Sequence, residues 1–78
     1  MIAFAITPYN IFGIADGKTC YVSAAARNPS LRVYERLTEN GLAHIDEALK
    51  ASGWCEHANV GETYEGKKFT IEVVEIDE

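Results

Sequence analysis

Large apolar residues alternate with small ones at the start of the chain. Ile2, Phe4 and Ile6 occupy every second position, and alanine stands between them. A period of two is typical of a strand that buries one of its faces. Pro8 lacks a backbone N–H and is typical of a turn, so the pattern predicts a strand over residues 1–7.

Two further runs of apolar and β-forming residues, Ile11–Ala15 and Thr19–Ser23, flank the dipeptide Asp16-Gly17. Asp-Gly suits the positive φ angles of a type I′ turn, which joins the two strands of a tight hairpin. The first third of the chain is therefore predicted to be a three-stranded antiparallel unit.

Helical periodicity begins after Asn28-Pro29. Asn caps the free backbone N–H groups at the start of a helix, and Pro is preorganised for the first helical position. Asn40-Gly41 is expected to end this helix or to kink it. The residues that recur at helical spacing between these two signals are Leu31, Tyr34, Leu37 and Thr38.

A second stretch with helical spacing leads to Ser52-Gly53, where another stop is expected. Its apolar residues are Leu42, Ile45, Ala48 and Leu49. The middle of the chain is thus predicted to form two short helices or one kinked helix. Because Leu31, Val33 and Leu37 also satisfy a period of two, a strand over residues 31–37 is the alternative.

The last third of the chain predicts a hairpin. Residues 64–67 are expected to close it between a short strand and a longer strand over 69–76. Phe69, Ile71 and Val73 alternate with polar residues, but Val74 and Ile76 reverse the phase, which a β-bulge or burial of both faces explains. The chain is therefore predicted to be a single α+β domain over residues 1–78, a small antiparallel sheet with one or two short helices packed on one face.

Length and charge exclude several classes of protein. Seventy-eight residues are too few for a dinucleotide-binding fold or a large enzyme cleft. The net charge of −5 argues against sequence-independent binding to DNA or to anionic membranes. No apolar run reaches the roughly 20 residues of a membrane span, and no basic residue precedes the apolar start as in a signal peptide. We expect a cytoplasmic protein that binds neither membranes nor nucleic acid directly.

Cysteine and histidine form no recognisable metal or nucleophile motif. Cys55 and His57 are too close for a zinc knuckle, and no second pair has finger-like spacing. No Gly-rich oxyanion loop accompanies them. We therefore expect no enzymatic activity, no metal and no cofactor. Cys20 and Cys55 are expected to be reduced in the cytoplasm, although their spacing does not decide whether they pair.

Charge is distributed unevenly along the chain. Residues 1–34 carry a net charge of +2 and residues 35–78 a net charge of −7. Strand residues two positions apart face the same side of the sheet and lie about 6.6 Å from each other. Glu75 and Asp77 are therefore predicted to share one side, and a bulge could bring Glu72 near them. The same acids would also protect an exposed edge strand from aggregation.

A row of carboxylates on a rigid edge imitates a phosphate backbone and attracts a groove rich in lysine and arginine. The candidate partner-binding residues are Glu62, Glu65, Glu72, Glu75 and Asp77, with Asp46 and Glu47 as a second cluster on a helix.

The chain resembles the small acidic inhibitors that bacteriophages and mobile elements encode, notably the anti-CRISPR proteins. The resemblance rests on size, one αβ domain, the acidic bias of residues 35–78 and the lack of catalytic groups. It covers the whole chain in kind and no segment in sequence. It implies an inhibitor that occupies a nucleic-acid-binding or protein-docking surface of a CRISPR effector complex in the cytoplasm of a bacterial host.

The leading prediction is a non-catalytic binding protein, monomeric or homodimeric, that inhibits a larger protein or ribonucleoprotein with a basic surface by imitating DNA. The alternative is a small structural or assembly subunit that docks through its apolar strands and a patch of tyrosine and arginine, two residue types enriched at protein interfaces. That patch would comprise Tyr9, Tyr21, Arg27, Arg32, Tyr34 and Arg36.

Overall fold

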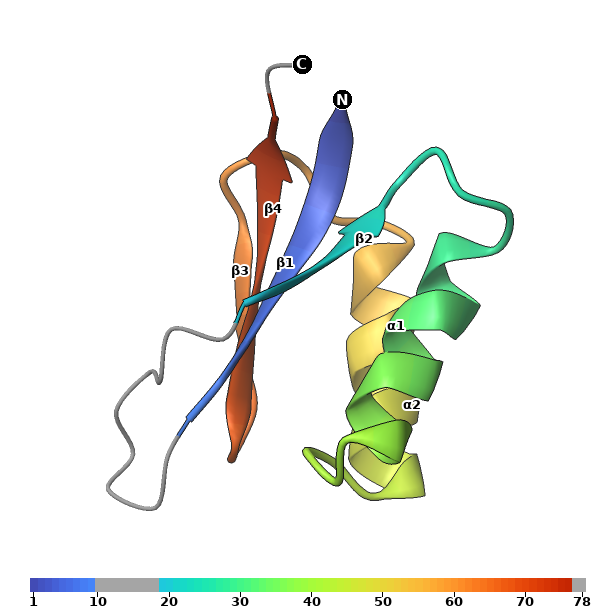
Figure 1. The fold of residues 1–78 in the computed structure, drawn as a ribbon, viewed down its shortest axis with the longest axis vertical. Coiled ribbons are helices and arrows are strands. Elements are labelled where there is room, and N and C mark those ends of the chain that lie inside the picture. Colours follow the sequence, from blue (N-terminus) through green and yellow to red (C-terminus); the bar gives the residue numbers. More distant parts are fainter. Residues whose placement is uncertain (10–18, 77–78) are drawn as a thin grey trace.

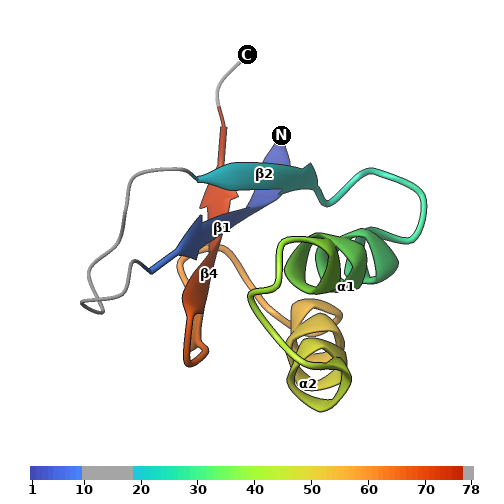
Figure 2. The same ribbon diagram turned by 60° about the horizontal axis from the view of Figure 1, so that its bottom comes forward.

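Among the residues that the structure describes, the sheet has four strands and both helices lie on the same face. The computed structural model describes residues 1–9 and 19–76 (Figure 1). In chain order the elements are β1 (Ile2–Pro8), β2 (Cys20–Ser23), α1 (Pro29–Glu39), α2 (Ile45–Cys55), β3 (Thr63–Glu65) and β4 (Phe69–Glu75). All neighbouring strands are antiparallel, in the order β2-β1-β4-β3. The predicted α+β class is confirmed, and Figure 2 shows the helices side by side along one side of the sheet.

The first strand, β1, lies inside the sheet between β2 and β4. Phe4 and Ile6 point toward the helices and are buried, as their alternation predicts. The strand extends one residue beyond the expected end, through Pro8. The N–H of the next residue, Tyr9, donates a hydrogen bond to Lys68 O at 2.8 Å. Because alternate residues of a strand bond to the same neighbour, the nitrogen of Pro8 points away from β4, and its missing hydrogen costs no bond to β4.

Only part of the predicted three-stranded unit can be compared with the structure. The run Thr19–Ser23 contains β2, which pairs with β1 through Ile6 opposite Cys20 and Ala3 opposite Ser23. The run Ile11–Ala15 and the turn Asp16-Gly17 lie outside the described residues.

Helix α1 begins and ends where the sequence indicates, so the alternative of a strand over residues 31–37 is wrong. Asn28 occupies the N-cap with a φ of 52°, but its side chain makes no capping hydrogen bond, and Pro29 is the first helical residue. At the other end Gly41 has a φ of 67°. The N–H of Gly41 bonds Thr38 O and that of Leu42 bonds Leu37 O, the Schellman arrangement that separates α1 from α2.

The buried faces of the two helices agree only in part with those predicted, since Leu37 and Ala48 are buried as expected. In α1 the fully buried residues are Val33 and Leu37, and Leu31 is 50% exposed. In α2 the buried residues are Ala48, Ala51 and Cys55, whereas Ile45 and Leu49 are 62% and 56% exposed. Small side chains let α2 approach α1 and the sheet closely, so packing selects the alanine face over the leucine face.

Helix α2 also continues through the predicted stop at Ser52-Gly53 and ends at Cys55. Gly53 keeps a helical backbone, since the described glycines with positive φ are Gly41 and Gly61. Trp54 and Cys55 pack on the core, and this packing holds the last turn in place.

The C-terminal hairpin of β3 and β4 is confirmed, but its turn lies later than predicted, because Tyr64 and Glu65 belong to β3 and pair with Ile71 and Thr70. The predicted β-bulge in β4 is wrong, because pairing with β1 runs without interruption from Ile2 opposite Glu75 to Pro8 opposite Phe69. The other explanation, burial of both faces near the end of the strand, is confirmed. Val73 faces the helices, and Val74 is half-buried on the opposite face, opposite Ala3, so both faces of β4 carry apolar residues near its end.

Candidate functional site

The face of the sheet that the helices leave uncovered carries two of the predicted partner-binding residues. Thr63 pairs with Glu72 and Glu65 pairs with Thr70, so Glu65 and Glu72 are diagonal neighbours on β3 and β4. Their alternation with the buried Ile71 and the half-buried Tyr64 directs both carboxylates away from the helices, and both residues are exposed. Diagonal neighbours of this kind lie about 7–8 Å apart.

Glu75 does not join this pair. Because β4 has no bulge, the alternation of its residues directs Glu75 and Glu72 to opposite faces of the sheet. The expectation that a bulge brings Glu72 toward Glu75 is therefore wrong. Asp77, the proposed neighbour of Glu75, lies outside the described residues.

Glu62 has a local structural contact. Its Oε1 accepts a hydrogen bond from the backbone N–H of Asn59 at 2.7 Å, and its own N–H bonds Asn59 O at 3.0 Å. The carbonyl oxygen of Glu62 accepts a hydrogen bond from the N–H of Val73, and this bond holds the turn between Asn59 and Glu62 against β4. Glu62 thus fixes the entry into β3 while it stays exposed at the edge of the sheet.

The second predicted cluster lies at the other end of this hairpin. Asp46 and Glu47 occupy the first turn of α2, where negative charge interacts favourably with the helix dipole. Glu47 Oε1 accepts a hydrogen bond from the backbone N–H of Lys67 at 3.2 Å, in the turn between β3 and β4. Lys67 and Lys68 lie around the same hollow as Glu47. The two clusters are therefore separated by two basic residues.

A groove that the sequence pattern does not predict crosses the sheet face that the helices leave uncovered. It has a volume of about 690 Å³ and is lined by residues that include Ala5, Thr7, Tyr21, Glu72 and Val74. The small side chains of β1 form its floor because Ala5 stands opposite Tyr21 on one side and Glu72 on the other. The signal present in the sequence is the run of small residues between the large ones of the first strand.

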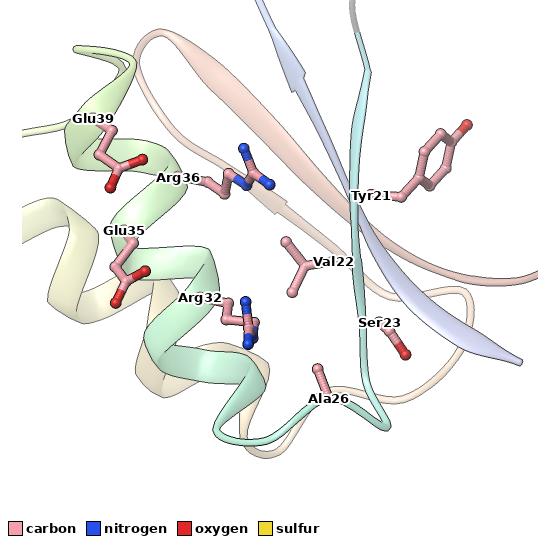
Figure 3. A pocket seen from close by; sticks show the side chains of 8 residues that line it. All are labelled: Tyr21, Val22, Ser23, Ala26, Arg32, Glu35, Arg36 and Glu39. Atoms are coloured by element: carbon pink, nitrogen blue, oxygen red, sulfur yellow. The ribbon is translucent and has the colours of Figure 1, made fainter.

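The tyrosine and arginine patch of the alternative prediction is brought together only in part. Tyr21, Arg32 and Arg36 line one groove between β2 and α1, shown in Figure 3. Tyr34 packs against the core instead. Tyr9 lies at the far end of β1, where it pairs with Lys68 beside the β3–β4 turn.

The two cysteines differ in burial, since Cys55 is buried and Cys20 is half-buried. Cys20 and Cys55 are free thiols and do not pair. Burial, with a smaller contribution from the neighbouring charge of Glu56, raises the pKa of the Cys55 thiol from 9.0 to about 12, so the thiol is protonated at neutral pH. Within residues 1–9 and 19–76, no group of three or more His, Cys, Asp or Glu side chains is placed to hold a metal ion.

Neither helix in the described part of the chain is long and apolar enough to cross a membrane. Comparison with protein-family models, with curated protein sequences and with solved structures finds no match in any of the three.

Proposed function

We propose that this chain is a non-catalytic binding protein that occupies a basic surface on a larger protein or ribonucleoprotein. The observation that carries the proposal is the position of Glu65 and Glu72, side by side and exposed on the uncovered face of the β3–β4 hairpin. Strand β4 is paired on both edges, so the hairpin presents the carboxylates on a fixed backbone. Less conformational entropy is lost on binding when the charged groups are held in this way.

Electrostatics favour the same kind of partner. The net charge of −7 over residues 35–78 attracts a basic surface and raises the rate of encounter with it. Lys67 and Lys68 limit the acidic surface to the part of the hairpin away from its turn. Glu62, just before β3, adds charge at the edge of the sheet, whereas Glu75 lies on the opposite face from Glu72.

In this proposal the carboxylates take the place of nucleic-acid phosphates. Lysine and arginine side chains that bind a phosphate backbone also bind carboxylates with charge-assisted hydrogen bonds. A protein that occupies such a groove competes with nucleic acid for it. CRISPR effector complexes, whose channels are positively charged, are the partner class suggested by the resemblance to small acidic inhibitors.

The test is competition between this protein and DNA. A fluorescent target duplex is bound to each purified CRISPR effector complex of a panel, and its release is followed by anisotropy as the protein is added. We expect release from at least one complex, and a weaker effect at about 300 mM than at about 50 mM salt.

Two double variants with the same change in net charge make the test specific. Glu65→Gln with Glu72→Gln is expected to weaken competition about tenfold or more, whereas Glu35→Gln with Glu39→Gln on α1 is expected to leave it nearly unchanged. Equal loss in the two variants would show that net charge alone matters. Full potency of the Glu65/Glu72 variant, or no release from any complex, would rule out the proposed inhibition.

An assembly subunit is the second candidate function, and the exposed ridge of α2 favours it. Ile45 and Leu49 are one turn apart and both largely exposed. Such a ridge suits helix packing between copies. A homodimer that persists at sub-micromolar concentration, is unaffected by salt and is dissociated by Leu49→Glu in sedimentation experiments is the expected result. A monomer at all concentrations would exclude this function for the ridge.

A further inference from the structure

The groove between α1 and β2 combines two arginines with a strand edge that no other described residue pairs with. It has a volume of about 340 Å³ and is bounded by Tyr21, Val22 and Ser23 on one side and by helix α1 on the other. In Figure 3, Arg32 and Arg36 extend from α1 toward β2, while Val22 points back toward the helix and Tyr21 points away from it.

The pairing of β2 leaves backbone groups free at its outer edge. Within the described residues, β2 pairs with β1 alone and forms one edge of the sheet. The N–H of Ala24 bonds Ile2 O at 2.9 Å, so alternate residues of β2, including Val22, bond β1. Tyr21 and Ser23 therefore direct their backbone groups outward. The carbonyl oxygen of Ser23 accepts a hydrogen bond from the N–H of Ala26. The groups that point toward the groove are therefore the N–H of Tyr21, the carbonyl of Tyr21 and the N–H of Ser23.

The two edges of the sheet differ in how they are protected. The opposite edge, β3, has only three residues and carries the charge of Glu65. Strand β2 consists of Cys, Tyr, Val and Ser, with neither a charge nor a proline to oppose another strand. Edge strands without such protection pair readily with an additional strand.

The spacing of the arginines matches that of an extended chain. Arg32 and Arg36 are four residues apart on α1, a rise of about 6 Å along the helix axis. Alternate side chains of a strand face the same side and lie about 6.6 Å apart. In Figure 3 the helix and β2 run alongside each other, so a strand added to β2 also runs past both arginines.

We propose that this groove binds an extended acidic peptide segment. The segment pairs with β2 as a fifth strand and places two carboxylates, two residues apart, on Arg32 and Arg36. The charge of the arginines selects an acidic segment over a basic one. Glu35 and Glu39 lie on α1 beside the arginines and disfavour carboxylates at other positions of the segment. Tyr21, which is 58% exposed, offers an apolar surface to side chains on the far side of the added strand.

The experiment uses a fluorescein-labelled peptide, acetyl-Thr-Thr-Glu-Thr-Glu-Thr-Thr-amide, and the full chain, with binding followed by anisotropy. The same peptide with glutamine at both glutamate positions is the ligand control. We expect saturable binding of the glutamate peptide, and binding of the glutamine peptide weaker by about tenfold or more. Equal binding of the two peptides would overturn the proposal.

Two protein variants with the same change in net charge test the arginines. Arg32→Ala with Arg36→Ala is expected to weaken binding of the glutamate peptide about tenfold or more, and Lys67→Ala with Lys68→Ala about twofold or less. The lysines are also exposed but lie at the β3–β4 turn, away from β2. Equal effects of the two variants would mean that the peptide binds no defined site.

Backbone changes test strand addition itself. Tyr21→Pro removes one outward N–H without removing a bond to β1, whereas Tyr21→Thr keeps that N–H. We expect only the proline variant to lose peptide binding, with circular dichroism confirming that it stays folded. If that variant unfolds, N-methylated peptides give the answer. In an antiparallel segment the N–H of the central threonine faces β2, so methylation of that nitrogen is expected to abolish binding. In a parallel segment the N–H groups of the glutamates face β2, so methylation of those nitrogens is expected to abolish binding instead.

Two further results would overturn the proposal. In the first, neither kind of N-methylation weakens binding, so the peptide does not pair with β2. In the second, the parent protein sediments as a dimer, Tyr21→Pro makes it monomeric and no peptide binds, so the edge of β2 is occupied by a second copy. Because Glu65 and Glu72 lie on the opposite edge strand and its neighbour, failure here leaves the proposed inhibition of a basic partner untouched.

Discussion

Glu47 in the first turn of α2 accepts a hydrogen bond from the backbone N–H of Lys67, 20 residues later in the chain. This contact joins the start of a helix to the turn between β3 and β4. Its oxygen also lies beside Gly66, the residue before Lys67 in that turn. One of the predicted partner-binding residues therefore holds the acidic hairpin against the helical layer.

The first prediction concerns this contact. Glu47→Ala removes the bond to Lys67 and a favourable charge at the helix N-terminus, and is expected to lower the free energy of unfolding by about 1–2 kcal/mol. Asp46→Ala, in the same turn of α2, removes a helix-dipole interaction alone and is expected to cost about 0.5 kcal/mol. Urea denaturation of both variants measures the difference. Equal losses would show that the bond to Lys67 contributes nothing to stability.

The titration of Tyr64 gives a second measure of Glu47. Burial raises the pKa of Tyr64, and the negative charge of Glu47 raises it further. Because Glu47→Gln removes the charge and keeps an acceptor oxygen, it is expected to move the pKa of Tyr64 part of the way back toward 10.0. Ultraviolet titration of the phenol measures this change. An unchanged titration curve would contradict the assigned influence of Glu47.

The third prediction concerns the close approach at Gly66. A Cβ added there would lie 2.4 Å from the Phe69 ring and 2.8 Å from Glu47 Oε1. Gly66→Ala is therefore expected to destabilise the protein by about 1–3 kcal/mol. Gly53→Ala is the matched control, since a Cβ at Gly53 meets nothing within 4 Å and alanine favours the helix, by about 0.5–1 kcal/mol. Thermal unfolding should show changes of opposite sign.

The fourth prediction compares two leucines of α1. Leu37 is fully buried, and Leu31 is half exposed. Leu37→Ala is expected to cost about 2–5 kcal/mol because it leaves a cavity between the helices and the sheet. Leu31→Ala is expected to cost less than about 1 kcal/mol. Similar losses for the two variants in chemical denaturation would mean that Leu31 also lies on the face of α1 that packs on the core, as its helical spacing suggests.

The fifth prediction concerns alkaline pH. The pKa of Cys55 is raised from 9.0 to about 12, so the unfolded chain loses this proton first as the pH rises. The contribution of Cys55 is therefore fully present below pH 9 and is lost between pH 9 and about 12. Stability of the parent, measured by urea denaturation, is expected to fall more steeply above pH 9 than that of Cys55→Ala. Parallel pH profiles of the two proteins would contradict this.

The sequence predicted the kind and order of the described elements because the signals involved act over a few residues. Alternation in Ile2, Phe4 and Ile6 specifies a strand, and Pro29 and Gly41 mark helix ends through their own backbone preferences. The acidic bias of the second half could also be read directly from composition.

Other features could not be predicted because they depend on residues far apart in the chain. Helical spacing allows two apolar stripes on α2, and only packing against α1 and the sheet selects Ala48 and Ala51 over Ile45 and Leu49. Local pattern allowed a bulge in β4, whereas its unbroken register with β1, some 70 residues earlier, directs Glu72 and Glu75 to opposite faces.

By itself the sequence determined an α+β chain with an acidic second half, since backbone preference, periodicity and charge are local properties. The tertiary structure decided which charges act together. It placed Glu65 diagonally across from Glu72, joined Glu47 to Lys67, and set Arg32 and Arg36 in one groove with β2. The physical reason is that strand register and helix packing, which are fixed only when the whole core closes, determine the side of the molecule on which each charge lies.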